Sequence, residues 1–308
     1  MKISFLIPAH NEEKIISKTL DNLLSIPYKD IEIILGLDGC TDKTEKIVKQ
    51  YAEKSKKIKY FSLNLREGKP TVIDFIIKKA SGDIIIINDA DWLFTVKSKF
   101  ALQKLLSIFK DKKVGGIAEP FPVEWDKENL KKSNFTYKMV AYSSYFWLLY
   151  QKERLASKKG DLWYASQPTM FLTNIFRKDL YKKNLSLGDD FERTKYIMDK
   201  GYSVILFDNQ ELPRMIASYN KISLRDFFKQ KIRTAMARSQ LKQSNIMPLT
   251  LFNYYIPANF FIIRKSFRKS PDIGVMMFVW IFLTSIATLI STFKEADTKA
   301  GWRLRAKR

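Results

Sequence analysis

Two aspartates spaced one residue apart follow a run of four isoleucines, in the segment Asp89-Ala90-Asp91. The isoleucines, residues 84–87, are β-branched and follow Ser81-Gly82-Asp83, a pattern typical of a strand buried on both faces. Carboxylates at the rim of a core repel each other and are costly to desolvate, and a divalent cation removes both costs. We therefore expect Asp89 and Asp91 to form a metal site at the carboxyl end of a parallel strand.

Three more loops with polar residues follow predicted strands. They are Pro8-Ala9-His10-Asn11-Glu12-Glu13, Asp38-Gly39-Cys40-Thr41-Asp42 and Arg66-Glu67-Gly68-Lys69. The carboxyl ends of parallel strands meet at one edge of a sheet, so we expect these loops to converge with the aspartate pair. Gly39 and Gly68 allow close approach of the backbone to a ligand, and Lys69 supplies a positive charge for phosphate. Acids for a metal and bases for phosphate predict a nucleotide-diphosphate site.

Strand and helix patterns alternate over residues 3–118, which predicts βαβ units and a mainly parallel sheet of the α/β class. Strands are predicted at 3–7, 31–37, 58–63, 84–87 and 114–118, and helices at 15–24, 42–52, 71–80 and 100–109. Asn11 is the expected N-cap of the first helix, and Asp42 opens the second with capping-box spacing. An aromatic core helix over 135–149, a strand at 170–172, a helix from about 190 and a strand at 204–207 complete the expected domain.

The composition is that of a globular chain with a strong positive charge. Its 308 residues are 46% hydrophobic and 28% charged, and 54 Lys+Arg against 32 Asp+Glu give a net charge of +22. Such a charge favours a polyanionic partner, either a nucleic acid, an anionic membrane surface or a phosphorylated ligand. The single cysteine, Cys40, is expected to pack rather than react and fits a reducing compartment. The N-terminus does not resemble a secretory signal peptide.

The C-terminal part changes character near residues 245–248, so domains are predicted at 1–245 and 246–308. No charged residue falls between Asp272 and Lys294, and a membrane-spanning helix is predicted at 273–293. The apolar run 249–263 is shorter and is broken by Asn253, Pro257 and Asn259, which indicates an interfacial segment or a second, imperfect span. Basic residues at 264–269 and 303–308 flank the predicted span on both sides, so the charges leave its orientation open.

The order of the four loops resembles that of the family-two glycosyltransferases, which have the GT-A fold. Residues 3–13 resemble the family's first strand and turn, Asp38-Gly39 its second motif, and Asp89-Ala90-Asp91 its DxD motif. Gly188-Asp189-Asp190 is similar to the family's Gly-Glu-Asp segment. Gln230-Lys231-Ile232-Arg233-Thr234 resembles the Gln-x-x-Arg-Trp motif of membrane-bound members, with Thr234 in place of the tryptophan. The resemblance covers residues 2–240, and the substitution at Thr234 argues against a processive, polymer-making role.

The resemblance implies a role for each matching residue. Asp190 would be the catalytic base, with Asp189 beside it, and Asp91 would bind Mg²⁺ or Mn²⁺ with support from Asp89. The nucleotide sugar would be bound by Pro8, Ala9, Asn11, Glu12, Asp38, Gly39, Lys69, Asp89, Ala90, Gln230 and Arg233. Arg233 is expected on the diphosphate, and Asp38 on the nucleotide base.

The resulting expectation is an inverting, metal-dependent hexosyltransferase at a membrane, with its catalytic domain in the cytoplasm. Its donor would be a UDP- or GDP-linked sugar, and its acceptor a hydroxyl of a lipid-linked molecule or a glycan. The enzymatic alternative is a polyprenyl-phosphate sugar synthase, whose anionic acceptor needs no general base. The charge of +22 also suggests a non-enzymatic alternative, a basic protein that binds nucleic acid or membrane. The lysines are scattered and no nucleic-acid motif is present, so no specific nucleic acid is expected.

Overall fold

The computed structural model describes residues 1–96, 98, 100–118, 127–167, 173–183, 188–207, 213–217, 219–243 and 250–294. The strand predicted at 170–172, the domain boundary at 245–248 and the basic tail at 303–308 lie outside these residues.

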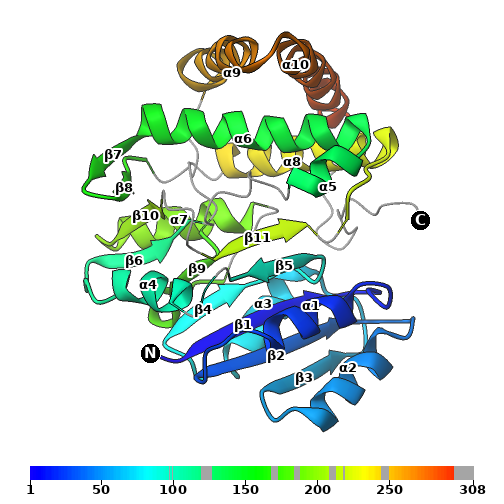
Figure 1. Ribbon diagram of the computed structural model, residues 1–308. Helices are drawn as coiled ribbons and strands as arrows, with labels where there is room; N and C mark the ends of the chain where they lie inside the picture. The colour runs from blue at the N-terminus through cyan, green and yellow to red at the C-terminus, as the bar shows by residue number, and fades with distance from the viewer. Residues whose placement is uncertain are drawn as a thin grey trace.

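A central sheet organises the described residues, with nine strands in the order β3-β2-β1-β4-β9-β6-β10-β8-β7 (Figure 1). Neighbours among β1 to β4 run parallel, as do β6 and β10. β9 lies antiparallel between β4 and β6, and the β7–β8 hairpin adds an antiparallel edge. The strands are β1 (Ile3–Ala9), β2 (Ile31–Asp38), β3 (Ile58–Leu63), β4 (Ile84–Ile87), β6 (Val114–Ile117), β7 (Ala156–Lys159), β8 (Leu162–Ala165), β9 (Ile175–Arg177) and β10 (Ser203–Phe207).

The predicted α/β class is confirmed, because helices cover both faces of this mainly parallel sheet. The helices α1 (Ile16–Leu24), α2 (Thr44–Lys54) and α4 (Ala101–Ile108) pack on one face. The opposite face carries α3 (Lys69–Ile77) and α7 (Asp189–Asp199). All four isoleucines of β4 are at most 1% exposed, as expected for a strand with helices on both sides. The short helix η1 (Lys178–Leu180) completes this part, whereas α5 (Lys127–Lys132) lies beside α6 and α8 in the helical layer described below (Figure 1).

A second, two-stranded sheet was not predicted. In it β5 (Trp92–Thr95), which directly follows the aspartate pair, runs antiparallel to β11 (Arg214–Ala217). The partners are more than 100 residues apart in the chain, and a lone four-residue strand carries no periodic signal strong enough to identify it. The pairing with β11 holds in place the chain that directly follows Asp91.

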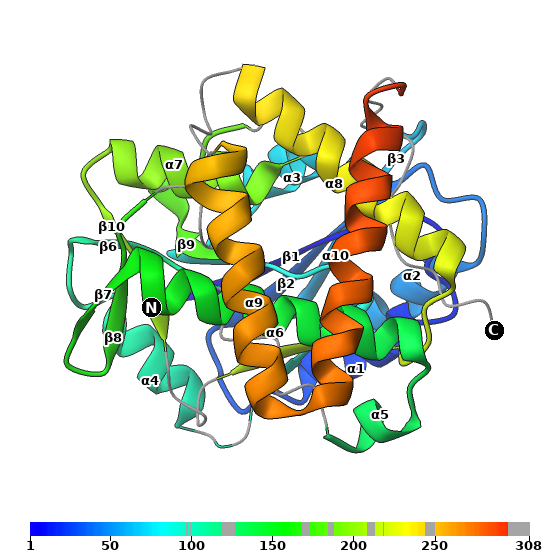
Figure 2. The ribbon, with the colours of Figure 1, turned by 90° about the horizontal axis from the view of Figure 1, so that it is seen from above.

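A layer of helices lies above the sheet (Figure 1). The long helices α6 (Phe135–Leu155) and α8 (Leu224–Gln243) form its lower part. Above them α9 (Ile256–Lys269) and α10 (Pro271–Ser291) lie side by side, as Figure 2 shows from above. A π-helical turn, η2 (Leu251–Tyr255), leads into α9. Residues of α6, α8, α9 and α10 share one apolar core.

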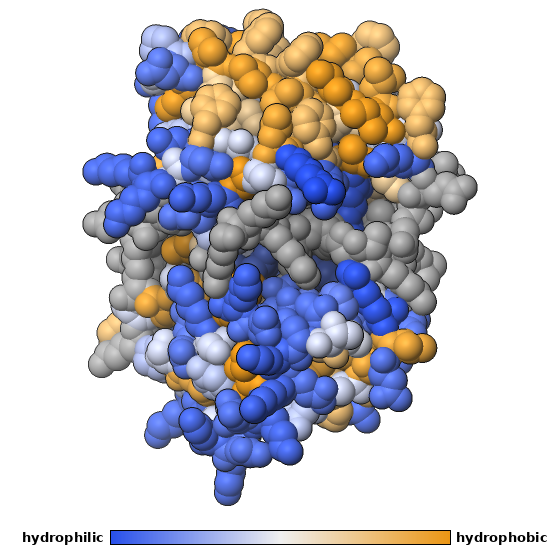
Figure 3. Space-filling view, turned by 90° about the vertical axis from the view of Figure 1, so that its right-hand side faces the viewer, coloured by the Kyte–Doolittle hydropathy of each residue, from blue (hydrophilic) through white to orange (hydrophobic). Residues whose placement is uncertain are grey.

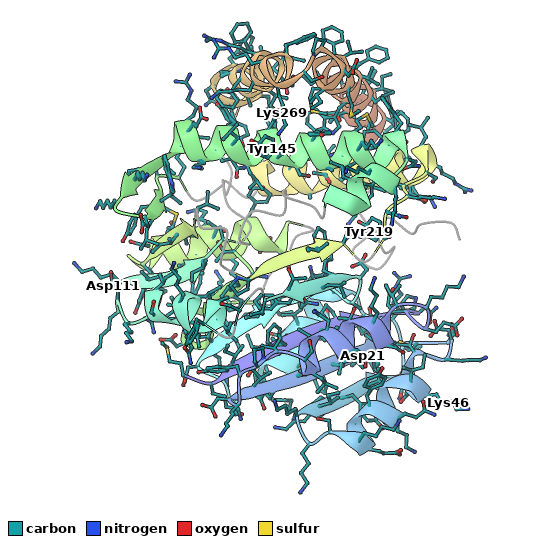
Figure 4. The ribbon with its side chains drawn as sticks, in the orientation of Figure 1. Asp21, Lys46, Asp111, Tyr145, Tyr219 and Lys269 are labelled. Atoms are coloured by element: carbon teal, nitrogen blue, oxygen red, sulfur yellow. The ribbon has the colours of Figure 1, made fainter. Side chains whose placement is uncertain are left out.

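The predicted C-terminal helices are present, with different bounds. The run 249–263 is divided between η2 and α9, and α9 continues through the basic stretch to Lys269. The ammonium of Lys269 lies 4.6 Å from the ring centroid of Tyr145 on α6, so a cation–π contact joins the end of α9 to the layer below (Figure 4). Among the described helices, α10 is long and apolar enough to cross a membrane.

Candidate active site

The turn at Asp89-Ala90-Asp91 is held by two neighbouring polar side chains. The Asn88 amide donates to the carbonyl oxygens of Asp89 (2.9 Å) and Trp92 (3.0 Å). The Thr19 hydroxyl, from α1, donates to the carbonyl oxygen of Ala90 at 2.6 Å. Asn88 and Thr19 are fully buried. Hydrogen bonds to the carbonyl oxygens of residues 89, 90 and 92 hold the backbone of the turn and so orient its carboxylates. The sequence did not point to Asn88 or Thr19.

Lys69 joins the aspartate pair to the segment Gly188-Asp189-Asp190. Its ammonium nitrogen lies 3.1 Å from Asp89 Oδ1 and 3.8 Å from Asp189 Oδ2. The three side chains are 12–17% exposed, so water screens their charges less than at the surface. The prediction placed Lys69 on phosphate; the structure places it between two acids from loops 100 residues apart.

Arg193 orients Asp189 from one helical turn further along α7. Its Nη2 lies 3.1 Å from Asp189 Oδ2, and its Nη1 donates to the carbonyl oxygen of Thr173 (2.7 Å) and to Asn174 Oδ1 (2.9 Å). The side chain is 1% exposed and stacks over Phe176 at 5.1 Å. This dense set of contacts makes Arg193 a positioning residue. Only its tertiary contacts identify it, because its sequence neighbourhood is an ordinary charged helix.

Asp189, which was predicted together with Asp190 as a catalytic residue, is held by two cations. Lys69 Nζ lies 3.8 Å and Arg193 Nη2 3.1 Å from the same carboxylate oxygen, and a catalytic role of Asp189 stays a prediction. The contacts give Asp189 the role of holding Lys69 and α7 in place. The backbone of Asp190 follows it in the first turn of α7, but the Asp190 side chain lies outside the described residues.

Asp38, at the end of β2, ties two of the predicted loops together. Its carboxylate accepts hydrogen bonds from the backbone nitrogens of Glu67 (2.7 Å) and Gly68 (3.0 Å). His10 Nδ1 lies 2.6 Å from the Asp38 carbonyl oxygen, which adds the loop after β1. Asp38 is 5% exposed, and its contacts hold the loops after β1 and β3 next to the loop after β2. A contact between Asp38 and the nucleotide base stays a prediction.

Gly39 is required by this arrangement, because it has φ 58°. A Cβ there would also lie 2.7 Å from the backbone nitrogen of Arg66. Cys40 is partly buried, its thiol lies 3.6 Å from the Ala9 carbonyl oxygen, and burial raises the pKa of the thiol. These observations fit the predicted packing role of Cys40.

Asn11 does not cap the first helix, and that prediction was wrong. α1 begins at Ile16, whereas Asn11 has φ 54° and accepts hydrogen bonds from the backbone nitrogens of Thr41 (2.8 Å) and Asp42 (3.3 Å). Asparagine tolerates this left-handed backbone conformation, and its side-chain oxygen accepts hydrogen bonds from backbone nitrogens of the neighbouring loop. Asn11 thus joins the loop after β1 to the loop after β2.

The loop after β2 is bound to the same neighbour by its other residues. Asp42 accepts from the backbone and hydroxyl of Thr44 and from the backbone of Glu13. Burial alone would raise the pKa of Asp42, but these hydrogen bonds outweigh burial and lower it. Glu12 is 7% exposed and its backbone nitrogen donates to the Thr44 hydroxyl at 2.7 Å. The prediction that these loops converge at one edge of the sheet is confirmed.

Gln230 and Arg233 come from a different layer, on α8. They lie one helical turn apart and are both partly buried, and the Thr234 hydroxyl donates to the Gln230 carbonyl oxygen at 2.9 Å. The hydroxyl of Thr234 is therefore hydrogen-bonded within its own helix, and Thr234 has no aromatic ring such as the tryptophan of the motif would offer to a ligand. A role of Gln230 and Arg233 on the diphosphate stays a prediction.

The two aspartates suit a hard divalent cation that a ligand helps to hold. Asp91 is 6% exposed and Asp89 lies two residues away in the same turn. In the described part of the chain no group of three or more His, Cys, Asp or Glu side chains is placed to hold a metal. Mg²⁺ is commonly held by one or two carboxylates with substrate phosphates and water, so a pair of acids beside Lys69 fits such an ion.

Comparison with known proteins places this geometry in a family. The family model described as glycosyl transferase family 2 matches residues 4–180, more than half of the chain. A probable glycosyltransferase, YdaM of Bacillus subtilis, is 36% identical over 128 residues, which are 40% of this chain and 30% of that protein. GalNAc(5)-diNAcBac-PP-undecaprenol beta-1,3-glucosyltransferase of Campylobacter jejuni is 24% identical over 193 residues, which are 58% and 62% of the two chains. The chain thus spans less than two thirds of the length of these relatives.

A solved structure shares the fold at low sequence identity. The mannosyltransferase PcManGT from Pyrobaculum calidifontis superposes with a TM-score of 0.57 at 16% identity, covering 97% of this chain and 77% of that one. The predicted GT-A fold is confirmed by this likeness and by the sheet order. The family match likewise confirms the predicted enzyme class, a glycosyltransferase. The loops that converge around Asp38, Asp89 and Lys69 all fall within the matched residues, and the chain belongs to glycosyl transferase family 2.

Proposed function

We propose that this protein is an inverting, metal-dependent glycosyltransferase that moves a hexose from a nucleotide-diphosphate sugar to an acceptor hydroxyl at a membrane surface. The observation that carries the proposal is the buried turn of Asp89 and Asp91, with the Lys69 ammonium 3.1 Å from Asp89. Carboxylates and a cation at the carboxyl edge of a parallel sheet combine the groups that a metal-bound diphosphate needs.

Asp91 is the proposed direct ligand of Mg²⁺ or Mn²⁺, because it is the last aspartate of the segment that resembles the DxD motif. The ion would neutralise the charge that develops on the diphosphate as it leaves. PcManGT, which shares the fold, was solved with GDP-Man and Mn²⁺, so this fold accommodates such a pair. Asp89 would support the ribose or the neighbouring ligands. The residues proposed to surround the donor are Pro8, Ala9, Asn11, Glu12, Asp38, Gly39, Lys69, Ala90, Gln230 and Arg233.

Asp190 is the proposed base. The acceptor oxygen bonds to the anomeric carbon while the bond from that carbon to the diphosphate breaks, and the hydroxyl proton passes to Asp190. The nucleotide leaves as its diphosphate, with inversion at the anomeric carbon. Asp189, held by Lys69 and Arg193, would fix the start of α7 and so the place of its neighbour.

The proposed acceptor is a lipid-linked molecule or a glycan. The Campylobacter relative, by its name, acts on an undecaprenol-linked acceptor, and α10 here is apolar and long enough to cross a membrane. We propose that residues 246–308 attach the domain 1–245 to the membrane, with the apolar segment 273–293 embedded in it and the catalytic domain in the cytoplasm. A polyprenyl-phosphate acceptor is the second candidate.

Nucleotide release tests the proposal. The full chain in detergent would be supplied with a panel of UDP- and GDP-sugars, Mn²⁺ or Mg²⁺, and a membrane lipid extract. We expect metal-dependent release from one donor that stops in Asp91→Asn. Asp21→Asn, on α1, is the matched control and should leave release unchanged. No metal-dependent release from any donor would refute the proposal.

Asp190→Asn separates the two acceptor classes. With a hydroxyl acceptor, loss of a positioned base lowers the rate by about 10²–10⁴-fold. With a phosphate acceptor, which is already an anion, Asp190→Asn would retain turnover while Asp91→Asn would not. The second outcome would replace the hydroxyl acceptor with a polyprenyl phosphate.

A further inference from the structure

A cavity of about 480 Å³ lies between the two levels of the helical layer, where α6, α8, η2 and α10 meet. Its volume is within the range of small-molecule sites. Trp147, Arg238, Tyr255, Trp280 and Thr284 contribute to its lining. None of these five belongs to the proposed catalytic site.

Arg238 gives the cavity a positive charge. Its guanidinium carbon lies 5.2 Å from the ring centroid of Tyr255 and 5.8 Å from that of Trp147, and a guanidinium on aromatic rings can still bind an oxyanion through its donor fork. Lys231 lies behind the same wall, with its ammonium nitrogen 5.0 Å from the ring centroid of Trp280, and burial lowers the pKa of Lys231 to about 7, so Arg238 is the cation that counts here. The lining residues of the described chain include no Asp or Glu, so the lining itself does not neutralise Arg238.

Two lining residues also carry a buried polar atom that lacks a hydrogen-bond partner within the described residues. They are Trp280, through Nε1, and Thr284, through its hydroxyl oxygen. The indole N–H only donates, and Trp280 is 94% buried, so an acceptor from outside the chain would relieve a real cost. One cation, Arg238, and two unused polar groups around the same cavity favour a ligand rich in acceptor oxygens, such as a phosphate.

The cavity lies below an apolar surface. The outer side of α10 exposes large apolar side chains, with Val275 at 57%, Phe278 at 65%, Phe282 at 61% and Leu289 at 65%. Figure 3 shows this hydrophobic cap over the hydrophilic body of the molecule. A ligand with its phosphate at Arg238 would therefore have an apolar surface available for hydrocarbon chains beside it.

We propose that this cavity binds the phosphate head group of an anionic membrane lipid, with Arg238, Trp280 and Thr284 on the phosphate and the acyl chains along α10. Basic pockets beside apolar helices suit such head groups. The site goes beyond the proposed function, because it uses no catalytic residue and would bind lipid in the absence of donor and metal.

Calorimetry on the full chain in detergent tests the proposal without any assay of activity. The probes are dioctanoyl phosphatidic acid, dioctanoylglycerol and inorganic phosphate, which carry the anion with chains, the chains alone and the anion alone. We expect phosphatidic acid to bind at least tenfold more tightly than either fragment. Equal binding of dioctanoylglycerol would reduce the cavity to an apolar groove, and equal binding of inorganic phosphate would make it a soluble-anion site; either result overturns the proposal.

Variants locate the bound lipid. Arg238→Met should weaken phosphatidic acid at least tenfold and Thr284→Val, nearly the same in shape, about threefold. Arg225→Met, which removes an exposed arginine from the same helix, should change the affinity less than twofold. If Arg238→Met does not fold, Thr284→Val and the three-probe comparison still decide. Equal affinities in Thr284→Val, Arg238→Met and the wild type would place the lipid elsewhere and refute the assignment.

Discussion

The Lys69 ammonium lies 3.1 Å from a carboxylate oxygen of Asp89, so a residue from the start of α3 neutralises one acid of the turn that follows β4. The second acid of that turn, Asp91, is 6% exposed. Asp89 therefore shares its charge with a residue of another loop, a contact that the spacing of the two aspartates does not reveal. The proposed assignment of the metal to Asp91 rests on its position as the last aspartate of the DxD-like segment.

Lys69→Met should separate the effect of Lys69 on metal binding from its effect on turnover. Removing the ammonium takes away a positive charge 3.1 Å from the Asp89 carboxylate, so we expect the affinity for Mn²⁺ without nucleotide to rise, measured by calorimetry. Turnover should fall by about 10²–10³-fold, the usual cost of losing one donor to a developing anion. Lys46→Met, on the exposed side of α2 (Figure 4), is the control for overall charge and should change neither quantity. Weaker Mn²⁺ binding in Lys69→Met would contradict the assigned role.

Arg193→Ala should be among the most destabilising single changes in α7. It leaves Asp189 at 8% exposure without its i,i+4 partner and deprives Thr173 and Asn174 of a donor. Breaking a buried pair by removing one partner costs about 3–5 kcal/mol, which urea unfolding would measure. Lys195→Ala removes an exposed i,i+4 pair with Asp199 from the same helix and should cost about 0.5 kcal/mol or less. Equal losses in the two variants would show that Arg193 does not hold the site.

Most of the parallel half of the fold could be predicted from the sequence, because its strands are continuous β-branched runs such as Ile84–Ile87 that alternate with amphipathic helices. The loops at the sheet edge followed from that topology. The β5–β11 pair and β9 were missed, since short strands paired across long separations depend on tertiary context.

The roles of single residues were harder to predict than the elements. Asn11 has the residue type and spacing of an N-cap, yet its side chain bonds the loop at Thr41, because a competing partner became available only in the folded chain. Arg193 and Asn88 carry no motif and are recognised only through burial and hydrogen bonds. The roles of such residues depend on tertiary packing and do not follow from the local sequence pattern.

Asn88→Ala tests the support of the aspartate turn. It removes the two hydrogen bonds from the Asn88 amide to the carbonyl oxygens of Asp89 and Trp92, whereas the Asp89 carbonyl oxygen keeps its bond from the Trp92 backbone nitrogen at 3.0 Å. We expect a loss of about 1–3 kcal/mol in the free energy of unfolding and a higher Mn²⁺ requirement for turnover. Asn22→Ala, which removes a hydrogen bond to the Phe94 backbone on the neighbouring strand, is the matched control. It should lower stability without changing the metal requirement; the same metal dependence in both variants would argue against a specific role for Asn88.

Glu32 should govern part of the acid sensitivity of the sheet. On β2 it is 3% exposed and accepts hydrogen bonds from Ser4 Oγ (2.6 Å), the Ser81 backbone nitrogen (2.6 Å) and Lys59 Nζ (3.0 Å). Burial alone would raise the pKa of this carboxyl, but the hydrogen bonds outweigh burial and lower the pKa from 4.5 to about 2. Such a shift corresponds to about 3 kcal/mol of stability.

The sign of the pH dependence follows from the lowered pKa. The unfolded chain takes up the proton at higher pH than the folded chain, so this stability is fully present above about pH 5 and is lost as the pH falls toward 2. Glu32→Gln should therefore be less stable than the wild type at pH 7 by about 2–3 kcal/mol, and the difference should shrink between pH 5 and pH 2. Urea unfolding across that range measures both quantities. Glu53→Gln, at an exposed position on α2, should follow the wild type throughout. A constant difference between Glu32→Gln and the wild type at every pH would mean that the carboxylate charge does not supply this stability.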